Sequence, residues 1–170
     1  MGDWGMPLPS HLKPALGQYL VLLDRWNRTH ALTSLPPGER REELLEDAAP
    51  LLPFLDALPS GARVIDLGTG MGCPAVVLAL ARPDLEVIGV DAVSKKMAFL
   101  RQVALELGLP NLKAVHGRFE ALAPLAGDLG VAKALAPIAQ LLGWWSRHGK
   151  PGRPFLALKG PSWDTEPRPT

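Results

Sequence analysis

The residues best suited to chemistry lie in a glycine-rich loop between two carboxylates. Asp66 ends an apolar run that begins at Val64, and a second apolar run ends in Asp91, roughly 20 residues beyond the loop. The loop glycines, at alternate positions, are Gly68, Gly70 and Gly72. Glycine allows a tight turn and close approach of the backbone to a ligand, which a Cβ would block. This layout predicts a nucleotide-binding strand–loop–helix–strand unit in which Asp91 hydrogen-bonds ribose hydroxyls.

The position of Asp66 narrows the class of ligand. A carboxylate at the mouth of the loop would repel a pyrophosphate, and the Gly-x-Gly-x-Gly spacing differs from that of dinucleotide enzymes. The same carboxylate suits a cation, and S-adenosyl-L-methionine carries a sulfonium, an ammonium and a ribose but no phosphate. The alternative is a glycine-rich turn in an ordinary α/β domain. Because Asp66 and Asp91 lie at successive strand ends, they favour a nucleotide-type site with S-adenosyl-L-methionine as cofactor.

Composition excludes several other classes of protein. The 170 residues, 47% of them hydrophobic and 21% charged, predict one globular domain over residues 1–170. The net charge of +1 gives no strong global attraction to nucleic acid, although a local basic face is compatible with it. Cys73 is the single cysteine, which excludes an internal disulfide and a cysteine-based zinc site and fits a reducing cytoplasm. We expect neither a signal peptide nor a membrane span.

The elements that must position the loop alternate between strands and helices. Predicted strands are residues 63–67, 86–90, 112–116, 130–135 and 154–158. Predicted helices are residues 12–27, 39–58 with interruptions near Pro50 and Pro53, 74–81, 95–107 and 138–145. Ser94 is expected to cap the helix over 95–107, and Gly108 to end it. Residues 1–60 then form an N-terminal helical part, 61–160 a Rossmann-like core and 161–170 a polar tail.

This alternation predicts an α/β fold with a doubly wound parallel sheet in the order 3-2-1-4-5, on which the N-terminal helices pack. Trp144 and Trp145 are adjacent in a helix and cannot share one face, so we expect one of them to be buried. The strand over 154–158 would be a bare sheet edge. We expect the tail or a second copy to cover it, unless Pro154 and neighbouring basic residues blunt it, and monomer and homodimer are both open.

Several short motifs together resemble one family. They are Arg25-Trp26-Asn27 with Leu32-Thr33-Ser34, Asp66 through Pro74, Asp91 with Lys95-Lys96, Gly117-Arg118-Phe119-Glu120 and Leu158-Lys159-Gly160. Between residues 16 and 160 the chain is similar to the glucose-inhibited division protein B family, the small-subunit ribosomal RNA guanine-N7 methyltransferases. The resemblance implies a methyltransferase that uses S-adenosyl-L-methionine and acts on ribosomal RNA or the small ribosomal subunit.

The resemblance also implies roles for individual residues. Gly68, Cys73 and the pair Phe119-Glu120 occupy positions that hold the methyl donor in the family. Phe119 replaces a small residue and is either a ring that stacks on adenine or a core aromatic at a strand end. Lys133 replaces an arginine after the fourth strand, and keeps the charge without the planar fork. The expected donor site comprises Asp66, Gly68, Gly70, Gly72, Cys73, Asp91, Phe119, Glu120 and Lys133.

Other departures lie on the presumed substrate side. Ala31 stands where the family has asparagine, and Leu44 and Ala48 stand where it has histidine and serine. The family continues well beyond Lys159-Gly160, whereas this sequence ends at Thr170. Three functions are therefore compatible with the sequence: a ribosomal RNA methyltransferase, a methyltransferase with another acceptor, and a non-catalytic relative that serves as a binding or interaction module.

The expected reaction makes few demands on side chains. Guanine N7 has a free lone pair, so its methylation needs alignment with the donor rather than a general base, and no catalytic residue is assigned. The histidines His11, His30, His116 and His148 show no metal-ligand spacing, so no metal is expected. RNA requires a basic surface. Candidate cations are Arg25, Arg28, Lys95, Lys96, Arg101, Arg118, Lys133, Arg147, Lys150, Arg153 and Lys159.

Overall fold

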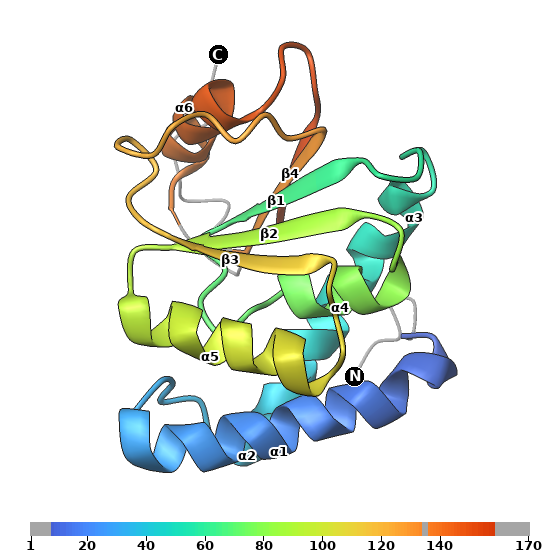
Figure 1. Cartoon of the computed structure of the whole chain (residues 1–170), viewed down its shortest axis with the longest axis vertical. Coiled ribbons are helices and arrows are strands. Elements are labelled where there is room, and N and C mark those ends of the chain that lie inside the picture. Colours follow the sequence, from blue (N-terminus) through green and yellow to red (C-terminus); the bar gives the residue numbers. More distant parts are fainter. Residues whose placement is uncertain (1–7, 134–135, 159–170) are drawn as a thin grey trace.

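The computed structural model describes residues 8–133 and 136–158, which form a parallel sheet with helices on both faces (Figure 1). The strands are β1 (Arg63–Leu67), β2 (Glu86–Asp91), β3 (Leu112–His116), β4 (Leu129–Lys133) and β5 (Phe155–Leu158). Every pairing is parallel and the order is β3-β2-β1-β4-β5, so the predicted architecture is confirmed. Residues 134 and 135, predicted to end the fourth strand, lie outside the described residues. So does the tail over 161–170, which is one of the two alternative covers expected for the β5 edge.

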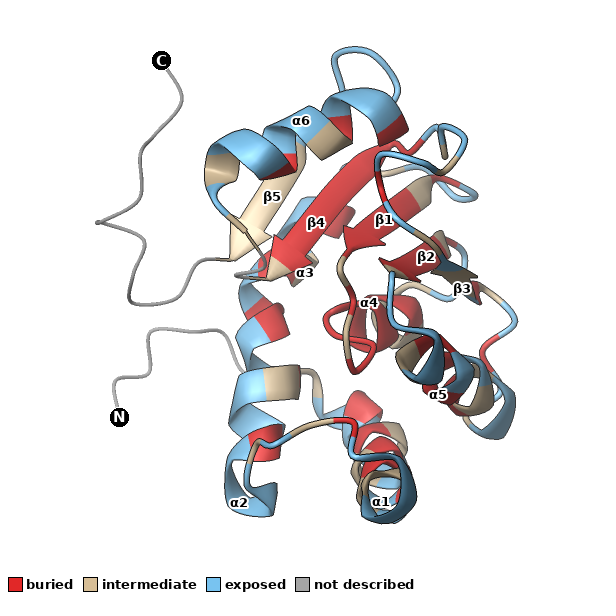
Figure 2. Cartoon of the chain, turned by 90° about the vertical axis from the view of Figure 1, so that its left-hand side faces the viewer, coloured by how far each residue is buried: buried red, intermediate tan, exposed pale blue. Residues whose placement is uncertain are grey.

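The sheet separates the core into two parts, because successive side chains along each strand point to opposite faces. Helices α1 (Lys13–His30), α4 (Ala75–Ala81) and α5 (Ser94–Glu106) lie on one side of the sheet, and α6 (Ile138–His148) lies on the other (Figures 1 and 2). Val64 of β1 faces the three-helix side, where the larger cluster of buried apolar residues lies. Ile65 and Leu67 face α6 and a smaller cluster. The register of the strands brings their carboxyl ends to one edge of the sheet.

The N-terminal part begins with a short 3-10 turn, η1 (Ser10–Leu12), that leads into α1. Helix α1 buries Leu16, Tyr19 and Leu23 completely, which is the amphipathic helix that the sequence predicts, extended to His30. It ends at Ala31, whose φ of 48° is left-handed and whose N–H donates to the Asn27 carbonyl at 3.1 Å.

The second N-terminal helix is more broken than its sequence predicts. Four short pieces follow one another: α2 (Pro37–Arg40), the π-helical η2 (Arg41–Leu45), the 3-10 η3 (Glu46–Leu51) and α3 (Leu52–Leu55). The sequence predicts a helix over 39–58 with interruptions near Pro50 and Pro53, and the structure has a longer irregular segment than this prediction. Pro50 lies inside η3, where it removes a backbone donor, but the irregularity already begins at Arg41.

The ends of α5 and α6 also differ from prediction. Helix α5 begins at Ser94 itself and has no side-chain cap, so the prediction that Ser94 caps it is wrong. Gly108, with a φ of +65°, follows the helix as predicted. Helix α6 continues to His148, and Trp145 is buried while Trp144 is half-buried, which confirms the expectation that one of the pair is inside.

Candidate functional site

The loop after β1 is held against β2 by its backbone. The N–H groups of Gly68 and Thr69 both donate to the Val90 carbonyl, at 2.8 and 2.9 Å. Gly68, Gly70 and Gly72 all have left-handed φ angles, of 75°, 55° and 91°. A side chain at any of these three positions would therefore strain the turn.

Two of the glycines face different surroundings. A Cβ on Gly72 would lie 2.8 Å from the Leu100 side chain and 3.1 Å from that of Val76, so Gly72 lets the loop pack closely on α4 and α5. A Cβ on Gly70 would meet nothing within 4 Å. Of the two, Gly70 is therefore the one positioned for close approach by a ligand.

Asp66 is a buried carboxylate with one unpartnered oxygen. Its Oδ2 accepts hydrogen bonds from the Thr69 hydroxyl at 2.7 Å and from the N–H of Ala75, the first residue of α4, at 3.0 Å. Oδ1 is buried and has no hydrogen-bond partner among the described residues. Burial raises the pKa of Asp66 to about 7, against the hydrogen bonds from Thr69 and Ala75 and the positive charge of Lys133, which lower it. Such a group gains most from a cation or a hydrogen-bond donor at Oδ1.

Asp91 connects the loop to the start of α5. Its Oδ2 accepts from the N–H of Gly70 at 2.9 Å, and its Oδ1 accepts from the N–H of Val93 at 3.0 Å. The side chain is half-buried. Each carboxylate oxygen keeps a further lone pair for a ligand hydroxyl.

The loop after β3 reaches the same edge of the sheet. The N–H of Gly117 donates to the Asp91 carbonyl at 3.0 Å. The Phe119 ring is buried in the smaller core cluster, 4.5 Å from the Trp144 ring centroid. This placement favours the core-aromatic alternative for Phe119. Glu120 is exposed, and its Oε2 accepts from the Trp144 indole N–H at 3.0 Å.

Lys133 is the last residue of β4 and contributes a cation to this edge. Its Nζ lies 3.5 Å from Oδ2 of Asp47 in η3. Its charge also acts on Asp66 and lowers the pKa of that carboxyl. Asp47 and Asp66 therefore both attract the ammonium of Lys133.

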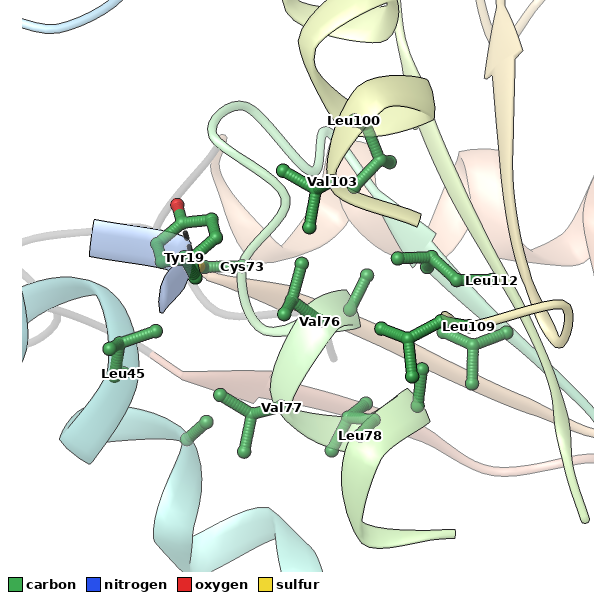
Figure 3. Close-up of a cluster of buried hydrophobic side chains, with 14 of the residues drawn as sticks. Tyr19, Leu45, Cys73, Val76, Val77, Leu78, Leu100, Val103, Leu109 and Leu112 are labelled. Carbon is green, nitrogen blue, oxygen red and sulfur yellow. Dashed lines mark hydrogen bonds between the residues drawn. The ribbon is translucent and has the colours of Figure 1, made fainter. Parts of the chain in front are cut away.

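The Cys73 side chain lies on the side of the loop that faces α1 (Figure 3). Its Sγ lies 3.5 Å from the Tyr19 hydroxyl, which donates to the Met71 carbonyl at 2.7 Å (Figure 3). Burial raises the pKa of the Cys73 thiol to about 12. The thiol is therefore protonated at neutral pH and serves as packing between the loop and α1.

The structure thus brings the predicted acidic, glycine and lysine residues to the carboxyl edge of the sheet, and it shows partners that the sequence did not reveal. Thr69 lies inside the predicted motif, three residues after Asp66. Its hydrogen bond to Asp66 could therefore have been predicted from the sequence. Tyr19 contacts Met71 across 52 positions of sequence, which no local pattern reveals.

Two of the departures on the presumed substrate side, Leu44 and Ala48, pack in the core. Ala48 is 2% exposed, and Leu44 packs against the larger core cluster. Neither position offers a polar group to a substrate. Ala31 has the left-handed conformation for which asparagine, the residue implied by the resemblance, is better suited.

Several candidate RNA-binding cations have partners within the chain. Arg28 pairs with Asp24 at 2.7 Å, Lys150 pairs with Asp128 at 2.8 Å, and the Lys95 ammonium donates to the Ala31 carbonyl at 3.1 Å. Lys159 lies outside the described residues.

Within the described ranges 8–133 and 136–158, no group of three or more His, Cys, Asp or Glu residues is arranged to hold a metal ion. None of the helices in that part of the chain is both long and apolar enough to cross a membrane.

Several solved structures with a similar fold are named as methyltransferases. One, from Geobacter sulfurreducens in complex with S-adenosyl-L-homocysteine, has a TM-score of 0.56 and 20% identity, and the match covers 81% of this chain and 54% of that one. Coclaurine N-methyltransferase also gives 0.56, at 14% identity, covering 91% of this chain and 55% of its own. The chain spans about half the length of these structures. At these identities the likeness shows the fold.

Relatives in sequence are more similar. Ribosomal RNA small subunit methyltransferase G of Bordetella pertussis is 41% identical over 168 residues, covering 95% of this chain and 73% of that protein. The protein of the same name from Neisseria gonorrhoeae is 38% identical over 143 residues, covering 84% and 68%. Residues 12–169 match the family described as rRNA small subunit methyltransferase G. With these matches over nearly its whole length, the chain belongs to the rRNA small subunit methyltransferase G family.

Proposed function

We propose that this chain transfers a methyl group from S-adenosyl-L-methionine to ribosomal RNA of the small subunit, at guanine N7. The observation that best supports the proposal is the buried Asp66 at the carboxyl edge of the sheet, whose Oδ1 has no hydrogen-bond partner within residues 8–133 and 136–158. In open α/β sheets ligands bind outside this edge. The family relatives are named for the small-subunit ribosomal RNA that they methylate. A ribosomal RNA substrate would place the protein in the cytoplasm.

The residues at the edge match the parts of the donor. The methionine part carries an ammonium and a carboxylate, for which Asp66 Oδ1 and the Lys133 ammonium are the complementary groups. The Gly68–Gly72 loop, open at Gly70, allows the donor to lie against the backbone. Asp91 retains lone pairs for ribose hydroxyls, and the Phe119-Glu120 pair borders the adenine.

The chemistry requires mainly orientation. The donor supplies a methyl carbon on a positively charged sulfur that leaves as a neutral thioether. A bond forms between guanine N7 and the methyl carbon as the carbon–sulfur bond breaks, and the positive charge passes to the guanine. No proton moves, so this chain's residues need only hold the donor, align the base and exclude water. Burial of Asp66 and Cys73 keeps the floor of the loop dry.

A second candidate is a non-catalytic relative that binds the donor. Ala48, buried at 2% exposure, and Leu44, packed on the core, favour it because the substrate side has lost two polar groups. The two functions predict the same donor binding and differ only in methyl transfer.

Two measurements test the proposal. Isothermal titration of the full chain with S-adenosyl-L-methionine should show binding, and tritium from labelled donor should enter RNA of small ribosomal subunits that lack the modification. Binding without transfer to subunits, free RNA or cell extract would establish the non-catalytic candidate. Absence of binding would overturn both.

A further inference from the structure

The last two turns of α6 hold the loop that follows β3. The indole N–H of Trp144 donates to Glu120 Oε2 at 3.0 Å, and its ring lies 4.5 Å from that of Phe119. One turn later, Arg147 Nε donates to the Leu122 carbonyl at 2.8 Å, and His148 Nε2 lies 2.6 Å from the Phe119 carbonyl oxygen. These contacts are made by one helix to one loop.

The contact at Glu120 differs from the others because it fixes a functional side chain rather than the backbone. Glu120 is exposed, and a hydrogen bond at an exposed carboxylate adds little to folding stability. It does restrict a glutamate side chain that would otherwise sample many rotamers. The indole only donates, so it occupies one carboxylate oxygen and leaves Oε1 as an acceptor.

We propose that Trp144 is a positioning residue for the methyl donor, which acts by orienting Glu120 toward the exocyclic amine of adenine. The proposal rests on the proposed function, in that it requires the donor's adenine to lie beside Glu120. The N–H of Gly117, in the same loop as Glu120, donates to the backbone carbonyl of Asp91 at 3.0 Å. Asp91 is the candidate ribose ligand, and the adenine is attached to the ribose, so this contact puts the Glu120 loop beside the expected position of the adenine.

Phe119 makes the arrangement testable. Because the Trp144 ring packs on the buried Phe119 ring, Trp144→Phe keeps an aromatic ring on the same neighbour and removes the N–H donor together with one ring of the indole. Ser146→Ala is the matched control, since Ser146 lies on the same helix, is exposed, and donates to the Gly143 carbonyl rather than to the loop.

The experiment is titration of the full chain with S-adenosyl-L-homocysteine and with its purine analogue, which lacks the exocyclic amine. Trp144→Phe should weaken binding of the adenine ligand about three- to tenfold, the scale of ordering one flexible side chain on binding. It should leave the purine analogue within about twofold, because that ligand offers no amine to Glu120. Ser146→Ala should change neither constant.

The variant Glu120→Gln tests whether Trp144 acts by orienting Glu120 or by packing on the loop. If Trp144 acts through Glu120, adding Trp144→Phe to Glu120→Gln should have little further effect, whereas independent roles would add. Thermal unfolding of each variant reports whether the protein is still folded. Trp144→Leu is a second replacement that also removes the N–H donor.

Three results would overturn the proposal: an unchanged affinity in Trp144→Phe, equal weakening of both ligands, or additive losses in the double variant. They are distinct from failure of the proposed function, in which the unaltered chain would bind neither ligand.

Discussion

The carboxylate of Asp91 accepts the N–H of Gly70 at 2.9 Å, so the end of one strand fixes the loop that follows its neighbour. The loop therefore has its conformation without a ligand, and the same carboxylate keeps lone pairs for one. Gly70 itself has a left-handed φ of 55°, a conformation that a residue with a Cβ adopts only at a cost.

Replacing Asp91 with alanine should weaken binding of S-adenosyl-L-methionine by about 1–3 kcal/mol, the scale of a hydrogen bond to a charged group. The Gly70 N–H also loses its partner, so a modest loss of thermal stability is expected. Asp84→Ala is the matched control, because Asp84 precedes the opposite end of β2 and pairs with Arg82 at 2.8 Å. Equal donor affinity in the two variants would show that Asp91 does not contact the donor.

Replacing Asp66 with asparagine should stabilise the ligand-free protein above pH 7. Burial raises the folded-state pKa of Asp66 to about 7 from an ordinary value of 3.8, so the folded state holds its proton more tightly than the unfolded state. The contribution of Asp66 to the free energy of unfolding is therefore fully present below about pH 4. It is lost as the pH rises through 7, by at most about 4 kcal/mol.

Urea unfolding of Asp66→Asn and of the unaltered chain, each at pH 5 and pH 8, measures this. The variant's advantage should be larger at pH 8, while its affinity for the donor should be lower because asparagine cannot pair with an ammonium as a carboxylate does. An advantage that does not change with pH would contradict the ionisation of a buried Asp66.

The Cys73 thiol should react slowly with iodoacetamide in the folded protein. Burial raises its pKa to about 12, and alkylation requires the thiolate. Mass spectrometry should show rapid modification in urea and little in buffer at pH 8. Tyr19→Phe removes the hydroxyl at 3.5 Å and is a useful comparison, since it should leave the slow reaction in place if burial dominates. Rapid labelling of the native chain would place Cys73 at the surface.

Ala31→Gly should stabilise the protein by about 1 kcal/mol, because Ala31 holds a left-handed φ of 48° that costs an L-residue with a Cβ. Asparagine should stabilise it by a smaller amount. Ala104→Gly, inside the right-handed helix α5, is the matched control and should destabilise by about 1 kcal/mol. Urea unfolding provides both values, and a destabilised Ala31→Gly would show that the strain is absent.

The strands and the loop could be predicted because their signals are local. Apolar runs bounded by Gly68 and Asp91 define two strands, and the parallel order follows from right-handed crossovers. The π and 3-10 turns between Arg41 and Leu51 could not be predicted, since apolar periodicity does not separate them from an α-helix. Ser94 was a plausible cap by type, but the backbone before α5 is instead bonded to Asp91.

The sequence also does not predict how the side chains of the site are oriented. A glycine loop predicts where a ligand lies, but whether Cys73 faces the ligand or α1 depends on Tyr19, far away in sequence. Phe119 was compatible with two roles for the same reason, because Trp144 belongs to a helix that packs on it only in the folded chain.

Lys133→Arg should raise the rate of methyl transfer if the ribosomal RNA reaction is retained. Lys133 reaches Asp47 at 3.5 Å as a point charge, whereas a guanidinium offers a planar fork that can bind a carboxylate or a base edge through two hydrogen bonds. Lys133→Met, of similar length without the charge, should lower donor affinity and the rate together. Asp47→Asn tests the pair from its other side and should leave the ammonium free for the donor. Initial rates with labelled donor and small ribosomal subunits measure all three, and a slower Lys133→Arg enzyme with unchanged donor affinity would show that this chain is adapted to lysine and to an acceptor of different shape.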